Sequence, residues 1–201
     1  MGFCLNQYST YPKIIPIKLS EREVAMDEGK IHEEALCLHP VVEGALKEAG
    51  IEYRAFPCDP ELADTMVFCK RYDFSPAQAA NAIIVAAKDN PVRYACCVVL
   101  ATTRLDVNKC VRRLMDGKKV SFASGEETVR LTGMQIGGVA PFGLPPIPIY
   151  VDLAVMEQPQ VIAGGGNRSS KVILAPSQFK KLSGVEIISG LAVPRPPQEQ
   201  S

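Results

Sequence analysis

The residues that could most clearly form a catalytic or binding site lie in a stretch rich in glycine and proline. This stretch, LTGMQIGGVAPFGLPPIPIYVD, spans residues 131–152. Glycine permits positive φ angles and lets a ligand approach bare backbone, while proline stiffens the surrounding chain. A rigid loop with exposed N–H groups is what an oxyanion hole or a carbonyl-binding site requires. The same composition also fits a tight connection between a helix and a strand, so this stretch alone leaves both interpretations open.

A second glycine cluster, AGGGNRSSK, spans residues 163–171 and lies between two predicted strands. It lacks the GxxxxGK[ST] spacing of a phosphate-binding P-loop and does not open a helix. Its amide, hydroxyl and cationic side chains could still bind a carboxyl, phosphate or ribose group, and the alternative is a flexible turn. The candidate substrate-binding residues in this cluster are Gly165, Gly166, Asn167, Arg168, Ser169 and Lys171.

The side chains that covalent and metal-dependent hydrolases use are sparse. The chain has two histidines, His32 and His39, and contains no GxSxG or HExxH motif. His39 precedes Pro40 at a predicted helix start, where capping or packing is the more frequent role. The seven cysteines form no CxxC pair, which predicts reduced, mostly buried thiols rather than a zinc site or a disulfide framework. We therefore expect no metal and no cofactor, and a site that holds a substrate and a water rather than a covalent nucleophile.

Composition and charge limit the possible partners. The 201 residues contain 22 basic and 22 acidic side chains, so nucleic acid would have to bind a local basic face. Solvated helix faces are the simpler interpretation of the two candidate groups, which are Lys109, Arg112, Arg113, Lys118 and Lys119, and Arg168, Lys171, Lys180 and Lys181. No apolar run is long enough for a signal segment or a membrane span, which predicts a cytoplasmic protein without membrane contact.

The elements that would position the two glycine clusters follow from hydrophobic spacing and capping signals. Residues 1–38 are expected to form an extended arm and a polar helix, and residues 193–201 a disordered, proline-rich tail. Near-continuous apolar runs at 82–88 and 94–103 predict a hairpin that is buried on both faces. Further helices are expected at 39–50, 60–72, 75–82, 106–117, 125–133 and 176–184, and strands at 51–56, 118–124, 146–152, 161–166 and 169–175. Hairpins and single helices, without repeated βαβ units, predict an α+β domain.

Five segments, NAIIVAAK, YACCVVLATTRLDVNKCVRRL, KKVSFAS, LTGMQIGGVAPFGLPPIPIYVD and VIAGGGNRSSKVILAPSQF, together resemble the YbaK-type aminoacyl-tRNA editing domain. This family includes the insertion domain of bacterial prolyl-tRNA synthetases and the free-standing ProX-type deacylases. The resemblance covers residues 39–192, and its most specific element is a GxxxP motif embedded in TGxxxGGVxPFG, at Gly137–Pro141.

The resemblance implies a mixed, largely antiparallel, barrel-like sheet surrounded by helices. It also implies hydrolysis, without a metal, of the ester that links a small amino acid to the 3′ end of tRNA. The matching catalytic-loop residues are Gly137, Gly138 and Pro141, whose backbone would line the pocket and hold the attacking water. A polar set after the second hairpin strand, Thr102, Thr103 and Arg104, is a further candidate for substrate binding.

One position departs from the family pattern. Many members carry a lysine that is needed for editing near the start of the first core strand, and here the matching residue is Asn81. Lys88 lies at the other end of the same strand, roughly 20 Å away at about 3.3 Å per residue, which is too far for it to substitute. Three interpretations remain: a subfamily with altered substrate or mechanism, a relative that only binds, or a different role on the same fold.

The hypothesis we favour is trans-editing of a mischarged tRNA that carries a small amino acid, with Asn81 positioning substrate or water. The alternative is a non-catalytic module that binds aminoacyl-tRNA or an aminoacyl-nucleoside. A third hypothesis is an interaction protein that uses its N-terminal arm. The expected partner is the aminoacylated 3′ end of tRNA, and an aminoacyl-tRNA synthetase is a further candidate partner.

Overall fold

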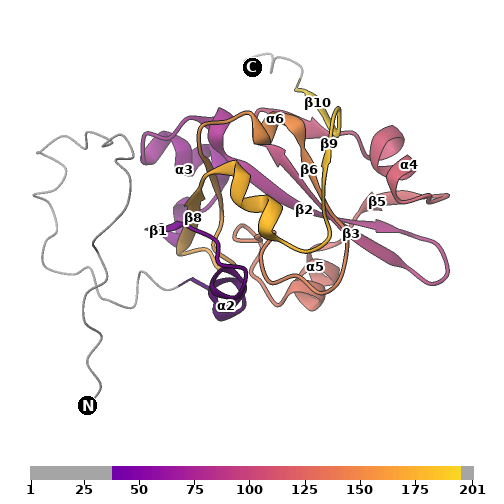
Figure 1. Ribbon diagram of the computed structural model, residues 1–201, viewed down its shortest axis with the longest axis horizontal. Helices are drawn as coiled ribbons and strands as arrows, with labels where there is room; N and C mark the ends of the chain where they lie inside the picture. Colours follow the sequence, from indigo (N-terminus) through magenta and orange to yellow (C-terminus); the bar gives the residue numbers. More distant parts are fainter. Residues whose placement is uncertain (1–37, 196–201) are drawn as a thin grey trace, which may run out of the picture. The chain divides into compact units, whose positions relative to one another are not determined.

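The computed structural model describes residues 38–195, which form three hydrogen-bonded β-sheets with helices packed around them (Figure 1). The predicted N-terminal arm and polar helix therefore lie outside the described residues, apart from Leu38. Two residues of the predicted tail, Val193 and Pro194, belong to strand β10 (Ala192–Pro194), and residues 196–201 lie outside the described range.

The largest sheet has five strands in the order β5-β2-β3-β6-β9. Its centre is the predicted hairpin, in which β2 (Ala80–Ala87) pairs antiparallel with β3 (Arg93–Leu100) along its whole length. β5 (Val120–Phe122) pairs antiparallel with the end of β2. β6 (Ile149–Asp152) and β9 (Val185–Ile188) extend the other edge in parallel pairing.

A second sheet has three antiparallel strands in the order β1-β8-β7, which are β1 (Arg54–Pro57), β8 (Ser170–Leu174) and β7 (Val161–Gly164). The smallest sheet pairs β10 with β4 (Thr103–Leu105). An isolated parallel bridge between Ala79 and Ile162 joins the three-stranded sheet to the five-stranded one. This architecture confirms the α+β prediction and the mixed, largely antiparallel pairing, although the sheets do not close into a barrel.

The helices are short, and most of them begin at a side-chain cap. They are α2 (Pro40–Glu48), η2 (Pro60–Leu62), α3 (Thr65–Arg71), η3 (Pro76–Gln78), η4 (Val107–Val111), α4 (Arg112–Leu114), α5 (Gly125–Thr132), α6 (Leu153–Met156) and η5 (Pro176–Lys181). The helix predicted at 60–72 is divided in two, because Asp59 caps η2 and the carboxylate of Asp64 accepts hydrogen bonds that start α3. None of the helices in residues 38–195 is long and apolar enough to cross a membrane.

The central hairpin is buried on both faces, as its apolar runs predict. Ile84 and Val98 pack into one hydrophobic cluster, which also contains Phe142, while Val85 and Val99 point to the opposite face and join a second cluster. A third cluster surrounds α3 and is rich in aromatic rings, among them Phe68. The cysteines in the described part of the chain are free and buried, and burial raises the pKa of Cys96 to about 12, which keeps that thiol unreactive.

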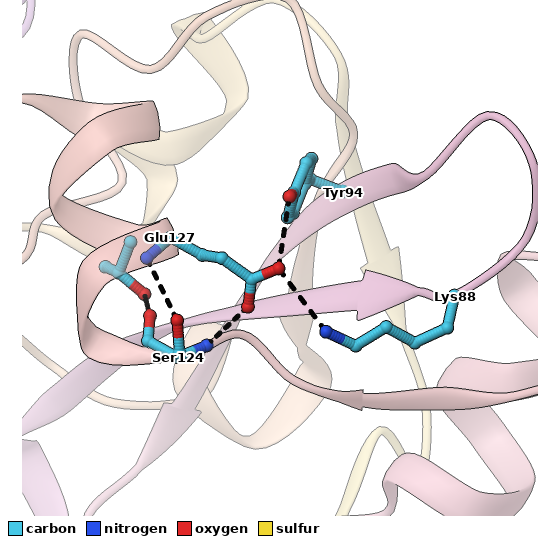
Figure 2. Close-up of polar contacts among 5 residues, drawn as sticks. Lys88, Tyr94, Ser124 and Glu127 are labelled. Atoms are coloured by element: carbon cyan, nitrogen blue, oxygen red, sulfur yellow. Dashed lines mark hydrogen bonds and ion pairs between the residues drawn. The ribbon is translucent and has the colours of Figure 1, made fainter.

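A polar network fixes the start of α5 against the hairpin (Figure 2). Ser124 and Glu127 form a capping box, in which each accepts a hydrogen bond from the other's backbone N–H. The other oxygen of Glu127 accepts hydrogen bonds of 3.3 Å from both Lys88 Nζ and Tyr94 Oη. The Ser124 N–H, with help from Lys88, lowers the pKa of Glu127. Lys88 is therefore bound at the end of β2 remote from Asn81.

Candidate functional site

A cavity of about 400 Å³ lies where the two larger sheets meet. Its walls come from the start of α3, the first half of β2, the end of β5, α5, the loop that carries the GxxxP motif, and strands β7 and β8. The side chains and backbone that matter for chemistry belong to Thr65, Phe68, Asn81, Thr128, Gly137 and Lys171. Segments far apart in the sequence therefore converge on one cavity that is open to the surface.

The GxxxP loop is held in a conformation that glycine favours. Gly137 has a φ of +90°, and any side chain on Gly138 would overlap the backbone of Asn167. The N–H of Gly138 donates to Gln135 O at 2.9 Å, and its carbonyl accepts from Gly166 N at 2.7 Å. Within residues 38–195 the N–H groups of Gly137 and Val139 have no backbone acceptor, and both residues line the cavity. The loop therefore offers two free backbone donors at the wall of the cavity.

The β7–β8 loop holds the GxxxP loop in position through hydrogen bonds and does not itself line the cavity. The guanidinium of Arg168 donates to Pro60 O, with an Nε–O distance of 3.0 Å, and to Ile136 O at 3.5 Å. The Asn167 side-chain oxygen accepts from the Ser169 N–H at 3.1 Å and from the Ser170 hydroxyl at 2.7 Å. The guanidinium of Arg168 therefore binds groups of the protein itself and connects the β7–β8 loop with the segments that contain Pro60 and Ile136.

The same loop reaches the start of α2. The carbonyl of Gly165 accepts from the His39 N–H at 2.9 Å, and a Cβ on Gly166 would meet the His39 side chain. His39 precedes the helix without a side-chain capping bond, and its Nδ1 is buried without a partner within the described residues. Packing, rather than capping, is thus the contact that the structure gives this histidine.

Asn81 faces the cavity from β2. Its Oδ1 accepts a hydrogen bond of 2.8 Å from the Thr65 hydroxyl, which fixes the orientation of the amide. The Nδ2 group has no acceptor within residues 38–195, so it can donate to a ligand in the cavity. Thr65 was not predicted as a site residue, and nothing in the sequence marks it, because it meets Asn81 only through folding.

Lys171 brings an amino group into the cavity from β8. The residue is 5% exposed, and its Nζ donates to Ala63 O at 2.9 Å and to Gly137 O at 3.4 Å. The nitrogen also lies 5.3 Å from the centroid of the Phe68 ring. None of the ion pairs between described residues includes Lys171. Burial lowers the pKa of Lys171, because desolvation penalises the charged form.

The predicted site residues thus divide into two groups. Asn81, Gly137 and Lys171 line the cavity, and Gly138 and the β7–β8 loop support its wall. Pro141 lies outside it and lines a second hollow. The polar set of Thr102, Thr103 and Arg104 is elsewhere as well, since β4 pairs with β10 and Arg195 donates to the Thr103 carbonyl at 2.9 Å.

The second hollow, of about 770 Å³, lies between α2, the proline-rich segment after the GxxxP motif, and the η5–β9 connection. Its lining residues are mostly apolar, such as Pro141, Leu144 and Pro145, and its charged lining residues are Glu48, Lys181 and Glu186. Among the described residues, no group of three or more His, Cys, Asp or Glu side chains could hold a metal ion in either hollow.

Residues 59–182 match the family model described as "Aminoacyl-tRNA editing domain". The fold is similar to the crystal structure of hypothetical protein APE2540, with a TM-score of 0.68 and 25% identity over 76% of this chain and 99% of that one. It is also similar to a protein described as "a putative trans-editing enzyme for prolyl tRNA synthetase", with a TM-score of 0.65 and 25% identity over 76% of this chain and 98% of that one.

A curated relative, the uncharacterized protein YwhH of Bacillus subtilis, is 35% identical over 68 residues. This match spans 33% of the chain and 43% of the relative.

Proposed function

Because this chain belongs to the aminoacyl-tRNA editing domain family, we propose that it hydrolyses the ester of a mischarged aminoacyl-tRNA carrying a small amino acid, acting in trans. The observation that carries the proposal is the convergence, in one cavity, of the Gly137 loop and the Asn81 amide. The similarity to a protein described as "a putative trans-editing enzyme for prolyl tRNA synthetase" supports action on tRNA charged by a synthetase, and our proposal includes a cytoplasmic location.

Backbone donors would perform the electrostatic part of this chemistry. The N–H groups of Gly137 and Val139 are free within the described residues, so they can bind the ester carbonyl oxygen or the attacking water. Asn81 Nδ2 supplies a third donor from the facing strand, with its orientation fixed by Thr65. Preorganised donors of this kind lower the barrier by stabilising the charge that develops on the carbonyl oxygen.

The reaction follows from these positions. Water attacks the ester carbonyl carbon, the carbonyl electrons move to oxygen, and the tetrahedral intermediate then breaks its bond to the ribose oxygen. That oxygen takes up a proton, which the neighbouring ribose hydroxyl can relay from the attacking water. The site itself then needs to hold and orient the reactants, which fits a mostly apolar cavity that offers a few fixed donors from the GxxxP loop and Asn81.

The size of the cavity supports a small aminoacyl group. Its apolar walls include Ala79, Ala80 and Ile162, while Phe68 closes one side. About 400 Å³ must also accommodate part of the terminal ribose, which leaves little room for a large side chain. Exclusion of larger aminoacyl groups would therefore be steric.

The mouth of the cavity offers a surface for the terminal base of the tRNA. Phe122, at the end of β5, is 56% exposed, and Ile136 in the GxxxP loop is 50% exposed, and both line the cavity. Exposed aromatic rings stack on nucleobases with little dependence on sequence. A 3′-terminal nucleoside placed against Phe122 would direct its ester inward, toward Asn81 and Gly137.

A second candidate function is binding without hydrolysis, and the observation that favours it is Asn81 in place of the lysine expected from the family resemblance. An amide can hold an aminoacyl group but carries no charge. In this case the protein would sequester aminoacyl-tRNA or an aminoacyl-nucleoside in the same cavity.

A deacylation assay separates the two candidates. The purified protein is incubated with tRNA charged separately with Ala, Ser, Thr and Pro, and release is compared with spontaneous hydrolysis in the absence of protein. We expect release of one small amino acid well above background. Saturable binding of a charged tRNA without release would instead establish the binding module, and neither release nor binding would remove both proposals.

A further inference from the structure

Lys171 is a buried cation that forms no ion pair within residues 38–195. Two of its three N–H bonds go to neutral carbonyls, Ala63 O and Gly137 O, and the ring of Phe68 contributes a weaker attraction. Buried charges are ordinarily paired with an opposite charge, because desolvation is costly. The third N–H remains for a ligand in the cavity that Lys171 lines.

We propose that Lys171 is a catalytic residue, whose ammonium donates to the ester carbonyl oxygen and stabilises the oxyanion that forms there. This inference rests on the proposed function. In the ground state the hydrogen-bond acceptors of the ammonium are the neutral carbonyls of Ala63 and Gly137, and an anion that it can bind directly forms when water has added to the carbonyl carbon. The attraction is therefore stronger in the transition state than in the bound substrate, which is the condition for acceleration.

Contact with the GxxxP loop places Lys171 close to the reacting ester. Its Nζ lies 3.4 Å from the carbonyl oxygen of Gly137, and the N–H of the same residue is one of the free donors of the loop. An oxygen bound by that loop is therefore within reach of the lysine. The oxyanion would receive hydrogen bonds from the loop backbone and from an ammonium on β8.

Lys171 is the cation that lines the cavity among the described residues. Arg168 is not a lining residue and binds the carbonyls of Pro60 and Ile136, and Lys88 pairs with Glu127. The family resemblance predicts a lysine where Asn81 stands on β2, and both Asn81 and Lys171 line the same cavity. The amino group thus enters the site from β8 instead of β2.

The titratable and charged groups that act on Lys171 come from the surrounding elements. Cys58 follows β1, Cys69 lies in α3, Asp64 caps α3, and Arg168 belongs to the β7–β8 loop. Burial raises the pKa of both thiols, so they are neutral near pH 7 and supply no counter-charge. Burial also lowers the pKa of Lys171 below its usual 10.5, so the ammonium should lose its proton at a lower pH than an exposed lysine.

The test compares Lys171→Met with the matched surface variant Lys70→Met, which changes an exposed residue of α3 outside the cavity lining, using the aminoacyl-tRNA that the wild type hydrolyses best. We expect kcat to fall about 100-fold in Lys171→Met, the cost typical of losing one oxyanion donor, and to be unchanged in Lys70→Met. Binding of a non-hydrolysable aminoacyl-adenosine analogue, in which an amide replaces the ester, should change less than threefold. A proportional loss of analogue binding would show that Lys171 only holds the substrate, and would overturn the catalytic role.

A second experiment moves the amino group from β8 to β2. In the double variant Asn81→Lys with Lys171→Met, the lysine returns to the β2 position, and we expect at least a tenfold recovery over Lys171→Met. The wild-type rate, corrected for spontaneous hydrolysis, should fall as the pH rises through the lowered pKa of Lys171, and Lys171→Met should lack that limb. Wild-type release that Lys171→Met leaves intact would overturn the role of Lys171 alone. No release by the wild type would remove the proposed function and this role with it.

Discussion

The two hollows described above, both within residues 38–195, differ in size and in the residues that line them. The larger, of about 770 Å³, is lined mostly by apolar residues such as prolines and alanines, and its charged lining residues are Glu48, Lys181 and Glu186. The smaller, of about 400 Å³, gathers Asn81, free backbone donors and the buried Lys171 at the meeting of two sheets. A glycine without room for a side chain lines each hollow, Gly164 the smaller and Gly143 the larger, but the buried cation occurs in the smaller one. Chemistry is therefore better located by the buried cation than by volume.

Replacing Gly138 should displace the GxxxP loop and so remove the backbone donors that distinguish the smaller hollow from the larger one. In Gly138→Ala the added Cβ would overlap the backbone of Asn167, which cannot yield as a flexible side chain can. We expect a loss of about 1–3 kcal/mol in the free energy of unfolding and a drop of about 100-fold in kcat/KM, because the donors of the loop are displaced. Gly44→Ala in α2 is the control, since its Cβ would meet nothing within 4 Å. Equal activity of the two variants would show that the loop is a structural connection only.

We expect Asn81 to contribute to activity through its Nδ2 donor rather than through its Oδ1 acceptor. Asn81→Asp keeps an oxygen for the Thr65 hydroxyl but lacks the N–H that faces the cavity. We expect kcat/KM to fall roughly 10- to 100-fold in both Asn81→Asp and Asn81→Ala, as for a hydrogen bond to a charged group. Single-turnover deacylation measures the effect. A wild-type rate in Asn81→Asp would show that the role of Asn81 is to accept the hydrogen bond from the Thr65 hydroxyl.

Lys171 should lower the stability of the fold that carries it. Replacing a buried cation that forms no ion pair within residues 38–195 by an apolar side chain of similar shape removes a desolvation cost, so Lys171→Met should be more stable by about 1–3 kcal/mol. Denaturant unfolding at pH 7 measures this difference. A less stable Lys171→Met would indicate that the lysine holds Ala63 and Gly137 together for structural reasons.

The difference in the free energy of unfolding between Lys171→Met and the wild type should depend on pH. The folded-state pKa of Lys171 lies below the value of 10.5 that the unfolded chain has, so between these two values the unfolded state binds more protons. Wild-type stability therefore rises with pH in this interval, relative to Lys171→Met. The advantage of the variant should be largest below the folded-state pKa and should shrink as the pH approaches 10.5.

The mouth of the cavity should give a smaller effect. Phe122→Ala removes the exposed ring that we place against the terminal base, and we expect KM to rise about fivefold with little change in kcat, at the low end of about 1–3 kcal/mol per stacked base. Phe122→Trp should retain the wild-type KM. Ile187→Ala, which alters an exposed apolar residue of β9 outside the cavity lining, is the control. A KM unchanged in Phe122→Ala would remove the base-stacking surface.

The second hollow supplies the smallest expected effect. Glu48→Gln changes a charge that lines this hollow and no residue of the cavity. We expect kcat/KM and stability within twofold and about 0.5 kcal/mol of the wild type, as for ordinary surface substitutions. A larger loss of activity would assign a substrate-binding role to the second hollow and weaken the contrast between the two.

Local signals in the sequence account for much of the fold. The hairpin of β2 and β3 follows from its apolar runs, and the capping box at Ser124 marks the start of α5. β9, β10 and α6 were not predicted, because β9 and β10 are short, half-exposed strands that exist through pairing with residues far away in the chain. The helix predicted at 60–72 was wrong in its continuity, since Asp64 starts a new helix within it.

The candidate site could be predicted only in part. Glycine composition identified both loops, but their mutual hydrogen bonds, such as Gly166 N to Gly138 O, join segments that no local pattern relates. Lys171 appeared in the sequence as a cation for phosphate or ribose, and its burial depends on contacts with Ala63 and Gly137, 108 and 34 residues away. Thr102 to Arg104 were predicted near the substrate, whereas β4 holds them at its edge against β10.

The junction between the sheets has a consequence for engineering. Within residues 38–195 the ladder contact that joins β2 and β7 is the isolated bridge from Ala79 to Ile162, so the two walls of the cavity belong to separate hydrogen-bonded frameworks. Libraries that vary Ile162 or Ala163 can reshape one wall without breaking the ladder of the opposite wall. This division makes the domain a tractable scaffold for retargeting, in which pocket width and reaction chemistry can be selected one after the other.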